Sequence, residues 1–348
     1  MRQLTFIKPG VLEWHDVPRP GLATDTDAIV RPIVVARCDL DLCIATGTGT
    51  GPRAFPGPFA FGHETIAAVT DAGDAAGVVP GEVVVVPFQL SCGRCDHCRG
   101  GFTNACSAYP PRAAFGLKPS SGTEFGGALS EVMRVPFADH MLIKVPHGVD
   151  PLGIASMADN LPDAWRAVAP QLAAWPGARV LVCGGWAQSI GLYAAGLAAS
   201  LGAGDVLYLD DDPQRRTIAE KTGARAEALA LSDRGAADKF DIVVDASGNQ
   251  DALRFAIAST APNGALTIVS MYFGESTPLP LERMYAKSMS FANARIHARM
   301  LIPPLLAHCA AGQFHAEHVT TRVVPFTEAP EGVFDPGPKI VFRNDWST

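Results

Sequence analysis

The sequence predicts an α/β protein that combines a mainly β domain with a doubly wound parallel-sheet domain. Three observations lead to this prediction. Short apolar runs broken by turns fill the first part of the chain, strand-like and helix-like segments alternate in its middle, and a mixed, partly strand-like tail follows. These textures assign residues 1–150 and 286–348 to the first domain and residues 151–285 to the second.

The first domain is predicted from its short alternating runs. EVVVVPF at residues 82–88 and ALSEVMRVP at residues 128–136 have the period of half-buried strands, and Gly and Pro interrupt the chain between such runs. After residue 285 a helix near 299–311 is followed by strand-like runs at 320–326 and 339–344. We expect this tail to complete the first domain.

The second domain is predicted from strand–helix alternation. Continuous apolar strands that alternate with helices indicate a parallel sheet covered on both faces. The expected strands are residues 178–184, 205–210, 241–247 and 264–270, and the expected helices are residues 189–203, 213–224 and 250–259.

Composition excludes several classes of function. The chain has 348 residues, of which 48% are hydrophobic, and a formal net charge of -7, so it lacks the basic character of a protein whose main partner is nucleic acid. The first residues do not form a signal peptide, and no apolar run is long and unbroken enough to cross a bilayer. We therefore expect a cytoplasmic protein with no membrane partner.

Four of the eight cysteines lie within one short loop. Cys92, Cys95, Cys98 and Cys106 have the spacing C-x2-C-x2-C-x7-C. In a reducing compartment such spacing indicates a metal site rather than disulfides, and four thiolates complete the tetrahedral shell of zinc. A closed shell leaves no position for substrate, so this site is predicted to be structural. His97 lies inside the loop and is a conceivable ligand, but four cysteines suffice and we expect it to face solvent.

A second metal site needs ligands from outside this loop. Cys38 follows a strand-like run, and His63 lies between Gly62 and Glu64 at the border of a loop and a strand. Either residue alone is more often a packed side chain than a ligand. A catalytic zinc would need three protein ligands and one open position.

Taken together with the cysteine loop and the strand–helix half, these residues resemble the zinc-dependent medium-chain alcohol dehydrogenase family over essentially the whole chain. The resemblance implies a GroES-like catalytic domain, a Rossmann domain, and two zinc ions per chain. The motifs that carry it are CDLD at 38–41, GHE at 62–64, PGEVV at 80–84, the cysteine loop, and GGALSE at 126–131.

The resemblance implies that Cys38 and His63 are catalytic zinc ligands. The third ligand of the family is a Cys or Asp at the junction into the nucleotide domain, where Asp159 falls. Asp163 is the rival for this role, and it could instead cap a helix that begins near Ala164.

Three further positions are interpreted through the same resemblance. Glu64 matches a carboxylate beside the metal that can become a fourth ligand, and Asp41 matches one that orients His63. The family commonly relays the alcohol proton through a hydroxyl and a histidine, and these positions are Leu40 and Cys43 here. The proton would then leave through the substrate's own hydroxyl, ordered water or Glu64.

The run ARVLVCGGWAQSIGLYAAG predicts a strand, a turn and a helix that can hold a dinucleotide pyrophosphate. The turn departs from G-x-G-x-x-G, because the expected second and third glycines are Trp186 and Ser189, and the helix glycine is Gly191. The residues predicted to bind the cofactor at this turn are Gly184, Gly185, Ser189, Ile190 and Gly191.

The end of the next strand predicts the choice of cofactor. Asp210 falls where an acid hydrogen-bonds the adenosine ribose of NAD and repels the extra phosphate of NADP. Arg215 matches a basic position of the family near the same ribose, and Arg215 with Arg216 leaves NADP as the second possibility. Asp211 and Asp212 are expected to cap the following helix.

The resulting hypothesis is an oxidoreductase that transfers a hydride between an alcohol, or an aldehyde or ketone in reverse, and NAD. The alternative is a nucleotide-binding family member with little or no turnover and a sensor or structural role, because the usual relay residues are replaced by Leu40 and Cys43. The family resemblance also implies a homodimer or a homotetramer.

Overall fold

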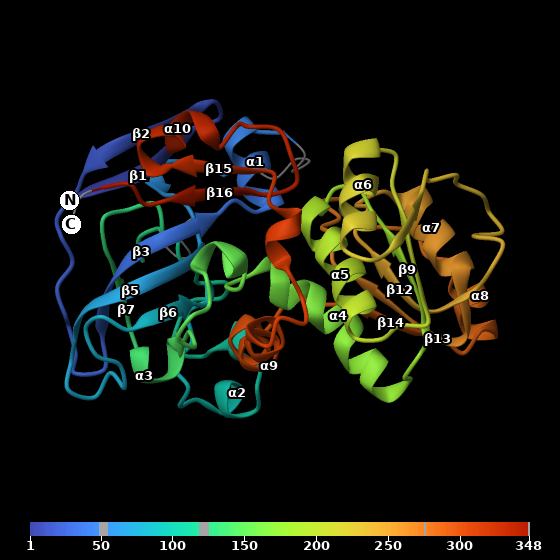
Figure 1. Cartoon of the computed structure of the whole chain (residues 1–348), viewed down its shortest axis with the longest axis horizontal. Coiled ribbons are helices and arrows are strands. Elements are labelled where there is room, and N and C mark those ends of the chain that lie inside the picture. The colour runs from blue at the N-terminus through green and yellow to red at the C-terminus, as the bar shows by residue number, and fades with distance from the viewer. Residues whose placement is uncertain (49–54, 118–124, 275, 347–348) are drawn as a thin grey trace. The chain divides into compact units, whose positions relative to one another are not determined.

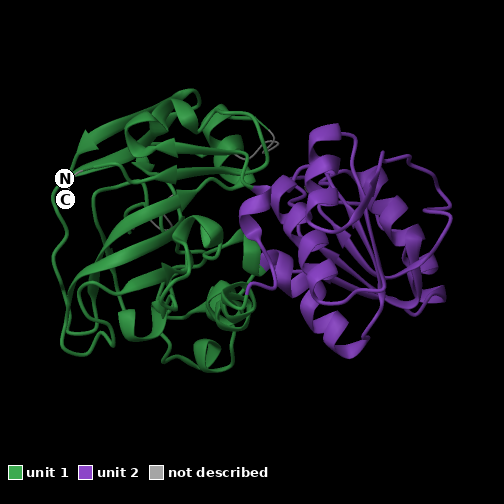
Figure 2. Cartoon of the chain, viewed as in Figure 1, with its two compact units in different colours: residues 1–162, 296–311, 320–348 green, residues 163–295, 312–319 purple. Residues whose placement is uncertain are grey.

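A computed structural model describes residues 1–48, 55–117, 125–274 and 276–346. The chain divides into two compact units, which Figure 2 shows in separate colours. Unit 1 comprises residues 1–162, 296–311 and 320–348, and unit 2 comprises residues 163–295 and 312–319. Among the described residues, no helix has the length and apolar character that crossing a bilayer requires.

Unit 1 is built mainly from strands. In the part of the chain that the structure describes, one sheet has the order β15-β16-β3-β5-β6-β8, with β7 also paired to β3, and a smaller sheet has the order β2-β1-β4. The strands are β1 (Arg2–Lys8), β2 (Val11–Asp16), β3 (Ala28–Ala36), β4 (Phe59–Ala60), β5 (Glu64–Ala72), β6 (Val83–Val86), β7 (Met133–Val135), β8 (Ile143–Lys144), β15 (Arg322–Pro325) and β16 (Ile340–Arg343).

The helices of unit 1 are short apart from one. They are α1 (Asp39–Thr46), α2 (Asp96–Arg99), α3 (Ala138–Met141), α9 (Ala298–Ala310) and α10 (Ala329–Gly332), with 3-10 turns at Thr103–Ala105, Pro151–Ile154 and Phe326–Glu328. Helix α4 (Asn160–Ala174) begins at the end of this unit. The core of this unit is apolar and includes Phe6, whose ring lies against those of Phe59 and Phe61.

Three adjacent strands bring distant parts of the sequence together in unit 1. Strand β16 pairs antiparallel with β3, where Val341 lies opposite Ala36. Strand β3 pairs antiparallel with β5, where Ala36 lies opposite Glu64. The residues just beyond these pairs, Cys38 and His63, therefore lie at the same end of the sheet.

Unit 2 contains a parallel sheet with the order β11-β10-β9-β12-β13-β14. Figure 1 shows this sheet between α5 and α6 on one side and α7 and α8 on the other, which is a doubly wound arrangement. The strands are β9 (Arg179–Cys183), β10 (Asp205–Leu209), β11 (Arg225–Glu227), β12 (Phe240–Asp245), β13 (Thr260–Ile268) and β14 (Ser290–Asn293). The helices are α5 (Gln188–Ser200), α6 (Pro213–Lys221), α7 (Gln250–Ser259) and α8 (Leu281–Ala286), with a 3-10 turn at Ala316–Val319.

The predicted fold class, mainly β sheets together with a doubly wound parallel sheet, is confirmed. The strands expected at 178–184, 205–210, 241–247 and 264–270 are β9, β10, β12 and β13, and the helices expected at 189–203, 213–224 and 250–259 are α5, α6 and α7. The expected start of α4 is wrong, because the helix begins at Asn160 rather than near Ala164. Asp163 therefore lies within the first turn of the helix, where it pairs with Arg166, and not before its first residue.

Candidate functional site

The four-cysteine loop converges on one point. The sulfur atoms of Cys92, Cys95, Cys98 and Cys106 all lie within 4.8 Å of one another, and none belongs to a disulfide. Sulfur atoms bound to one zinc ion at about 2.3 Å in tetrahedral geometry lie roughly 3.8 Å apart. The separation between Cys95 and Cys106, 4.0 Å, is close to that value. His97 is exposed and is not part of the cluster.

Backbone amides of the loop point at these sulfur atoms. The N–H of Cys92 donates to Cys106 Sγ at 3.3 Å, that of Cys95 to Cys92 Sγ at 3.4 Å, and that of Cys98 to Cys95 Sγ at 3.5 Å. Amides of Cys98 and Ser107 lower the pKa of the Cys95 thiol to about 5, whereas burial raises that of Cys98 to about 12. The amides favour thiolates, which are the form that binds a metal.

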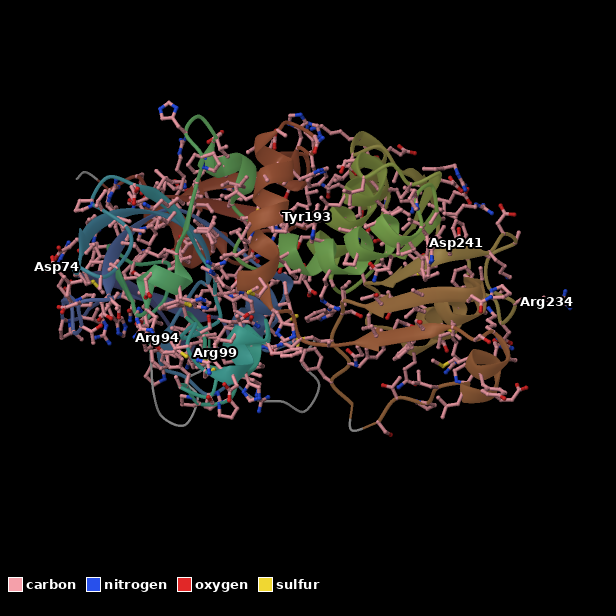
Figure 3. All side chains as sticks on the ribbon, turned by 90° about the horizontal axis from the view of Figure 1, so that it is seen from below. Asp74, Arg94, Arg99, Tyr193, Arg234 and Asp241 are labelled. Carbon is pink, nitrogen blue, oxygen red and sulfur yellow. The ribbon has the colours of Figure 1, made fainter. Side chains whose placement is uncertain are left out.

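The outer side of the loop is charged and exposed. Arg94 and Arg99 carry their side chains there (Figure 3), and Arg99 pairs with Asp96. Behind the loop, Ser91 Oγ lies 3.0 Å from His140 Nε2. The loop is therefore attached to α3, which carries His140, as well as closed on itself.

The second group of candidate ligands is gathered at the end of the β3–β5 pair. Ligand atoms of Cys38, His63, Glu64 and Asp159 all lie within 4.8 Å of one another, although Asp159 is separated from the others by about a hundred residues of sequence. Cys38, His63 and Glu64 are buried, and Asp159 is half-buried. A sulfur, an imidazole nitrogen and carboxylate oxygens are the donors that zinc prefers.

Helix α1 fixes Cys38. Cys38 is the N-cap of this helix: its sulfur accepts from the N–H of Asp41 at 3.4 Å, and Asp41 Oδ2 accepts from the N–H of Cys38 at 3.0 Å. This reciprocal pair is a capping box in which cysteine takes the place of serine or threonine. The spacing of CDLD thus holds the thiol at the start of α1.

His63 lies between two carboxylates. Its Nε2 is 3.2 Å from Asp159 Oδ2, and its Nδ1 is 3.3 Å from Asp41 Oδ1. The second contact does not have hydrogen-bond geometry, so His63 Nδ1 and Asp41 Oδ1 are buried without a hydrogen-bond partner. Burial lowers the pKa of His63, but Asp41, Cys38 and Asp159 outweigh burial and raise it well above the usual value. Such a concentration of negative groups around one imidazole fits a site for a cation.

Glu64 pairs with Lys339, a residue outside the sequence motifs that indicate the site. Lys339 Nζ lies 3.3 Å and 3.4 Å from the two carboxylate oxygens of Glu64, and both side chains are fully buried. The ammonium group also donates to the carbonyl oxygen of Arg37 at 2.9 Å. Burial raises the pKa of Glu64 to about 8, even though Lys339 opposes the increase. In a single sequence, nothing about a lysine that precedes a strand-like run indicates that its side chain is buried.

Leu40 and Cys43, at the positions of the usual proton relay, lie in α1. Leu40 packs against the hydrophobic core of unit 1. Neither side chain pairs a hydroxyl with an imidazole, so the structure offers no relay of the usual chemistry at these two positions.

The predicted dinucleotide turn connects β9 to α5. Gly184 and Gly185 follow the strand, and Ser189, Ile190 and Gly191 lie in the first part of the helix. A Cβ atom on Gly185 would lie 2.7 Å from the carbonyl oxygen of Ser247, so only glycine fits this close approach. Helix α5 has no side-chain cap at its N-terminus, where backbone N–H groups commonly bind phosphate.

Two amides of the turn are already used within the protein. The N–H of Trp186 donates to the carbonyl oxygen of Ser247 at 3.0 Å, and that of Ala187 to Ala246 at 2.9 Å. These bonds join the loop after β9 to the loop after β12. The donors left to a phosphate are therefore to be sought at the start of α5 rather than at Trp186 and Ala187.

Asp210, at the end of β10, is buried and surrounded by donors. Its Oδ1 accepts from Arg215 Nη2 at 2.6 Å and from the N–H of Asp212 at 2.9 Å. Its Oδ2 accepts from Arg215 Nε at 2.8 Å and from the Tyr208 hydroxyl at 2.7 Å. Arg215 thus neutralises the charge of Asp210. The N-cap of α6 is Asp212, and the expectation that Asp211 shares this role is wrong.

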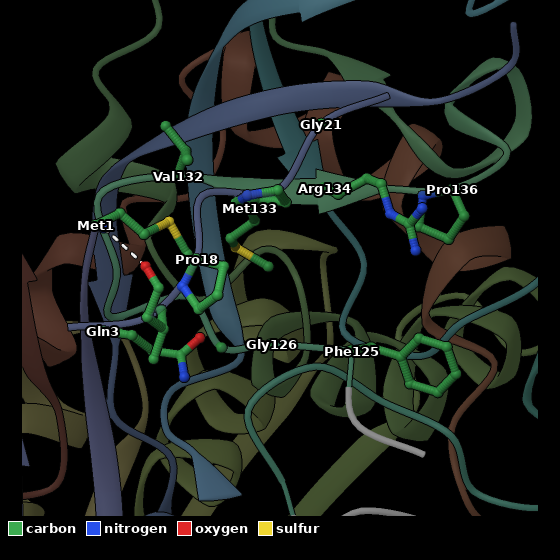
Figure 4. Close-up of a pocket in the computed structure, with 13 residues that line it drawn as sticks. Met1, Gln3, Pro18, Gly21, Phe125, Gly126, Val132, Met133, Arg134 and Pro136 are labelled. Carbon is green, nitrogen blue, oxygen red and sulfur yellow. Dashed lines mark hydrogen bonds between the residues drawn. The ribbon is translucent and has the colours of Figure 1, made fainter. Parts of the chain in front are cut away.

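A separate cavity of about 410 Å³ lies in unit 1 and is shown in Figure 4. Its lining includes Gln3, Pro18, Phe125, Met133 and Arg134. None of the candidate metal ligands lines it, so this cavity is distinct from both metal clusters.

Comparison with known proteins identifies two family models in the chain. The model described as alcohol dehydrogenase GroES-like domain matches residues 24–147, and the model described as zinc-binding dehydrogenase matches residues 189–311. Zinc-type alcohol dehydrogenase B of Aspergillus flavus is 26% identical over 95% of this chain and 78% of that protein. L-threonine 3-dehydrogenase of Streptomyces coelicolor is 30% identical over 74% of this chain and 72% of that protein.

Among solved structures, the alcohol dehydrogenase TADH from Thermus sp. ATN1 is similar along the entire chain. It has a TM-score of 0.88 and 28% sequence identity, and the match covers 99% of this chain and 100% of that chain. The comparisons point to oxidoreductases, and they give no support to the alternative of a sensor or structural role.

Proposed function

This chain belongs to the zinc-dependent medium-chain alcohol dehydrogenase family, and from that premise we propose that it is an NAD-dependent alcohol dehydrogenase with two zinc ions. The observation that carries the proposal is the convergence of ligand atoms from Cys38, His63, Glu64 and Asp159 within 4.8 Å. The substrate class is an alcohol, or an aldehyde or ketone in the reverse direction.

The proposed catalytic zinc is held by Cys38, His63 and Asp159, with Glu64 beside it as a conceivable fourth ligand. The unpaired Nδ1 of His63 and Oδ1 of Asp41 support this assignment. When Nε2 binds a metal, Nδ1 carries the proton, and the negative charge of the Asp41 carboxylate, 3.3 Å away, favours that tautomer. The remaining position is left for substrate, because three protein ligands are the usual number at a catalytic zinc.

The proposed structural zinc is held by Cys92, Cys95, Cys98 and Cys106. Four thiolates complete its shell, so these residues stabilise the loop and take no part in the reaction. When bound, zinc at the other site supplies a Lewis acid that favours the ionised alcohol and polarises the carbonyl, and NAD supplies the hydride acceptor.

NAD is the proposed cofactor, with residues 151–285 as its domain and residues 1–150 and 286–348 as the catalytic domain. Gly184 and Gly185 let the backbone approach the dinucleotide, and Ser189, Ile190 and Gly191 supply the start of α5. The carboxylate of Asp210 supports NAD over NADP, and the pairing with Arg215 weakens its repulsion of a phosphate. The proton is proposed to leave through the substrate's hydroxyl, water or Glu64, because Leu40 and Cys43 cannot relay it.

A metal analysis combined with a substrate panel tests the proposal. We expect two zinc ions per chain and formation of NADH with members of a panel of primary alcohols, secondary alcohols, polyols and L-threonine. Cys38→Ser should retain one zinc ion and lose the activity. One zinc ion in the wild-type chain together with no NADH formation across the panel would contradict the proposal. We propose a homodimer or a homotetramer in the cytoplasm, and sedimentation measures its oligomeric state.

A further inference from the structure

Lys339 is a fully buried cation with two kinds of acceptor beside it. Its ammonium group donates to the carbonyl oxygen of Arg37 and to both carboxylate oxygens of Glu64, at distances from 2.9 Å to 3.4 Å. Neither Lys339 nor Glu64 is exposed to solvent. Burial of a charge without a partner is costly. Removal of either side chain would therefore leave the other charge buried without its partner.

The backbone around Lys339 leaves its side chain little choice of direction. Lys339 immediately precedes β16, whose Ile340 accepts a hydrogen bond from the N–H of Arg37 at 2.9 Å. The guanidinium group of Arg37 is buried and donates to the carbonyl oxygens of Val333, Asp335 and Gly337, so it fixes the segment that leads into Lys339. The ammonium group is thereby held over the start of β5, where Glu64 lies.

Glu64 also lies close enough to the proposed zinc site to act as a ligand. One of its carboxylate oxygens lies within 4.8 Å of the ligand atoms of Cys38, His63 and Asp159. The same carboxylate therefore faces both the Lys339 ammonium group and the place of the proposed zinc. It can form an ion pair with Lys339 or bind the metal.

The charge balance indicates which choice keeps the site reactive. A divalent cation with one thiolate, one carboxylate and a neutral imidazole is neutral in total, and its fourth position is free for substrate. If Glu64 entered the ligand shell, that position would be filled and the centre would carry a net negative charge. The pair with Lys339 neutralises Glu64 separately from the metal.

We propose that Lys339 is a positioning residue that holds Glu64 out of the zinc ligand shell and so keeps one coordination position open. The inference rests on the proposed function, because it requires that Cys38, His63 and Asp159 hold a metal. Lys339 is fully buried and lies outside the proposed set of zinc ligands.

Replacement of zinc by Co²⁺ allows the open position to be probed in the full chain. Imidazole, which binds a vacant coordination position, is titrated against the visible absorption bands of the Co²⁺ protein. The variants are Lys339→Met, which keeps the length of the side chain without its charge, and Lys339→Arg, which keeps the charge. The double variant Lys339→Met with Glu64→Gln removes both charges of the pair.

We expect the wild-type protein and Lys339→Arg to bind imidazole with similar affinity. Lys339→Met should bind it at least about tenfold more weakly, because Glu64 then occupies the fourth position, and the metal should be released more slowly to a chelator. The double variant should regain the wild-type response. Lys339→Gln replaces Lys339→Met if the latter does not fold, and the same loss is expected.

Two results would overturn the inference: unchanged imidazole affinity in Lys339→Met, or a double variant that remains as weak as Lys339→Met, which would indicate a merely structural role. The proposed function fails in a different way. If the wild-type chain holds only the metal of the cysteine loop and shows no imidazole response, both the proposed function and the inference are wrong. If it holds two metals and Lys339→Met is unaffected, only the inference is wrong.

Discussion

Asp41 Oδ1 lies 3.3 Å from His63 Nδ1, and both atoms are buried without a hydrogen-bond partner. An imidazole in this position needs a neighbour that fixes its tautomer, and a carboxylate on Nδ1 leaves Nε2 for a metal. Since the other oxygen of Asp41 accepts from the N–H of Cys38 at 3.0 Å, one side chain orients two of the proposed ligands.

Asp41→Asn is therefore expected to weaken the proposed catalytic zinc site without unfolding the protein. The amide can still accept from the N–H of Cys38, but it presents a donor or a neutral oxygen to His63. Loss of such a partner typically costs about 10–100-fold in metal affinity. Competition with a chelator measures the affinity, and Asp74→Asn, at an exposed carboxylate, is the control. Equal zinc retention in both variants would contradict the assignment.

Removal of one cysteine of the loop should cost stability and one metal ion. Cys98→Ser leaves three thiolates, and loss of a structural metal belongs to the mechanisms that destabilise by more than about 3 kcal/mol. Denaturant unfolding and metal analysis test this prediction, with Cys309→Ser, outside both clusters, as the control. We expect the Cys309 variant to keep both zinc ions. A Cys98 variant that keeps two zinc ions and wild-type stability would refute a four-cysteine site.

The pairing of Asp210 with Arg215 leads to a prediction about cofactor choice. Arg215→Ala removes the cation that neutralises Asp210, and the carboxylate should then repel the extra phosphate of NADP more strongly. We expect the affinity for NADP relative to that for NAD to fall about tenfold, which corresponds to about 1.4 kcal/mol. Arg216→Ala is the matched control, because it removes a neighbouring cation that donates to the backbone carbonyl oxygens of Asp210 and Asp211.

Binding of the reduced dinucleotides can be followed by their fluorescence, so the result does not depend on turnover. The Arg215 variant is also expected to be less stable, because Asp210 remains buried with Tyr208 and the N–H of Asp212 as its donors. A rise of NADP affinity relative to NAD in Arg215→Ala would show that Asp210 does not act on the phosphate.

Much of the fold could be predicted because its signals are local. Hydrophobic periodicity predicts the alternation of strands and helices from β9 to β13. The metal site of the cysteine loop is predicted by the spacing of four cysteines within fifteen residues. The short strand β11 was not expected, because RAE at 225–227 has little apolar character. Strand β14 lies at the other edge of the sheet, where three of the four residues in its short SFAN run are exposed, so this run is too short and too polar at its ends to predict a strand.

The second metal cluster could not be predicted from local signals. Cys38, His63 and Asp159 come from separate segments, and only the resemblance to a family placed them together. Lys339 could not be identified at all, because its role depends on the register of β16 with β3 and of β3 with β5. The sequence indicates a role for both Asp210 and Arg215 in cofactor binding, but their bidentate pairing depends on the tertiary structure.

His140 leads to a prediction of pH dependence. Burial lowers the pKa of His140, and the neighbouring Arg299 lowers it further, while Asp139 opposes both. Because the folded state binds this proton less readily than the unfolded chain does, stability is full above the unfolded value of about 6.5 and declines as the pH falls below it. His140→Gln should remove this part of the decline.

Unfolding free energies of wild type and His140→Gln, measured between pH 5 and pH 8, separate this contribution from general acid effects. The difference between the two proteins should change with pH below about 6.5 and be constant above it. Glutamine can retain a hydrogen bond to Ser91, which lies 3.0 Å from the imidazole, so the zinc loop keeps its attachment. A difference that is constant over the whole range would show that His140 does not titrate differently on folding.

Gly116 supports the segment that carries His63, and its replacement tests how tightly that segment is packed. A Cβ atom on Gly116 would lie 1.7 Å from the carbonyl oxygen of Gly62, which is backbone and cannot rotate away. Gly148 also has a positive φ, 87° against 58° at Gly116, but a Cβ atom there would contact nothing within 4 Å. Gly148→Ala therefore measures the cost of the backbone conformation alone, about 1–2 kcal/mol.

We expect Gly116→Ala to lower the free energy of unfolding by about 3–5 kcal/mol, because the steric clash adds to the same strain. It should also weaken zinc binding at His63, whereas Gly148→Ala should not. Equal effects of the two substitutions in denaturant unfolding would mean that the Gly62–His63 segment yields to the added methyl group.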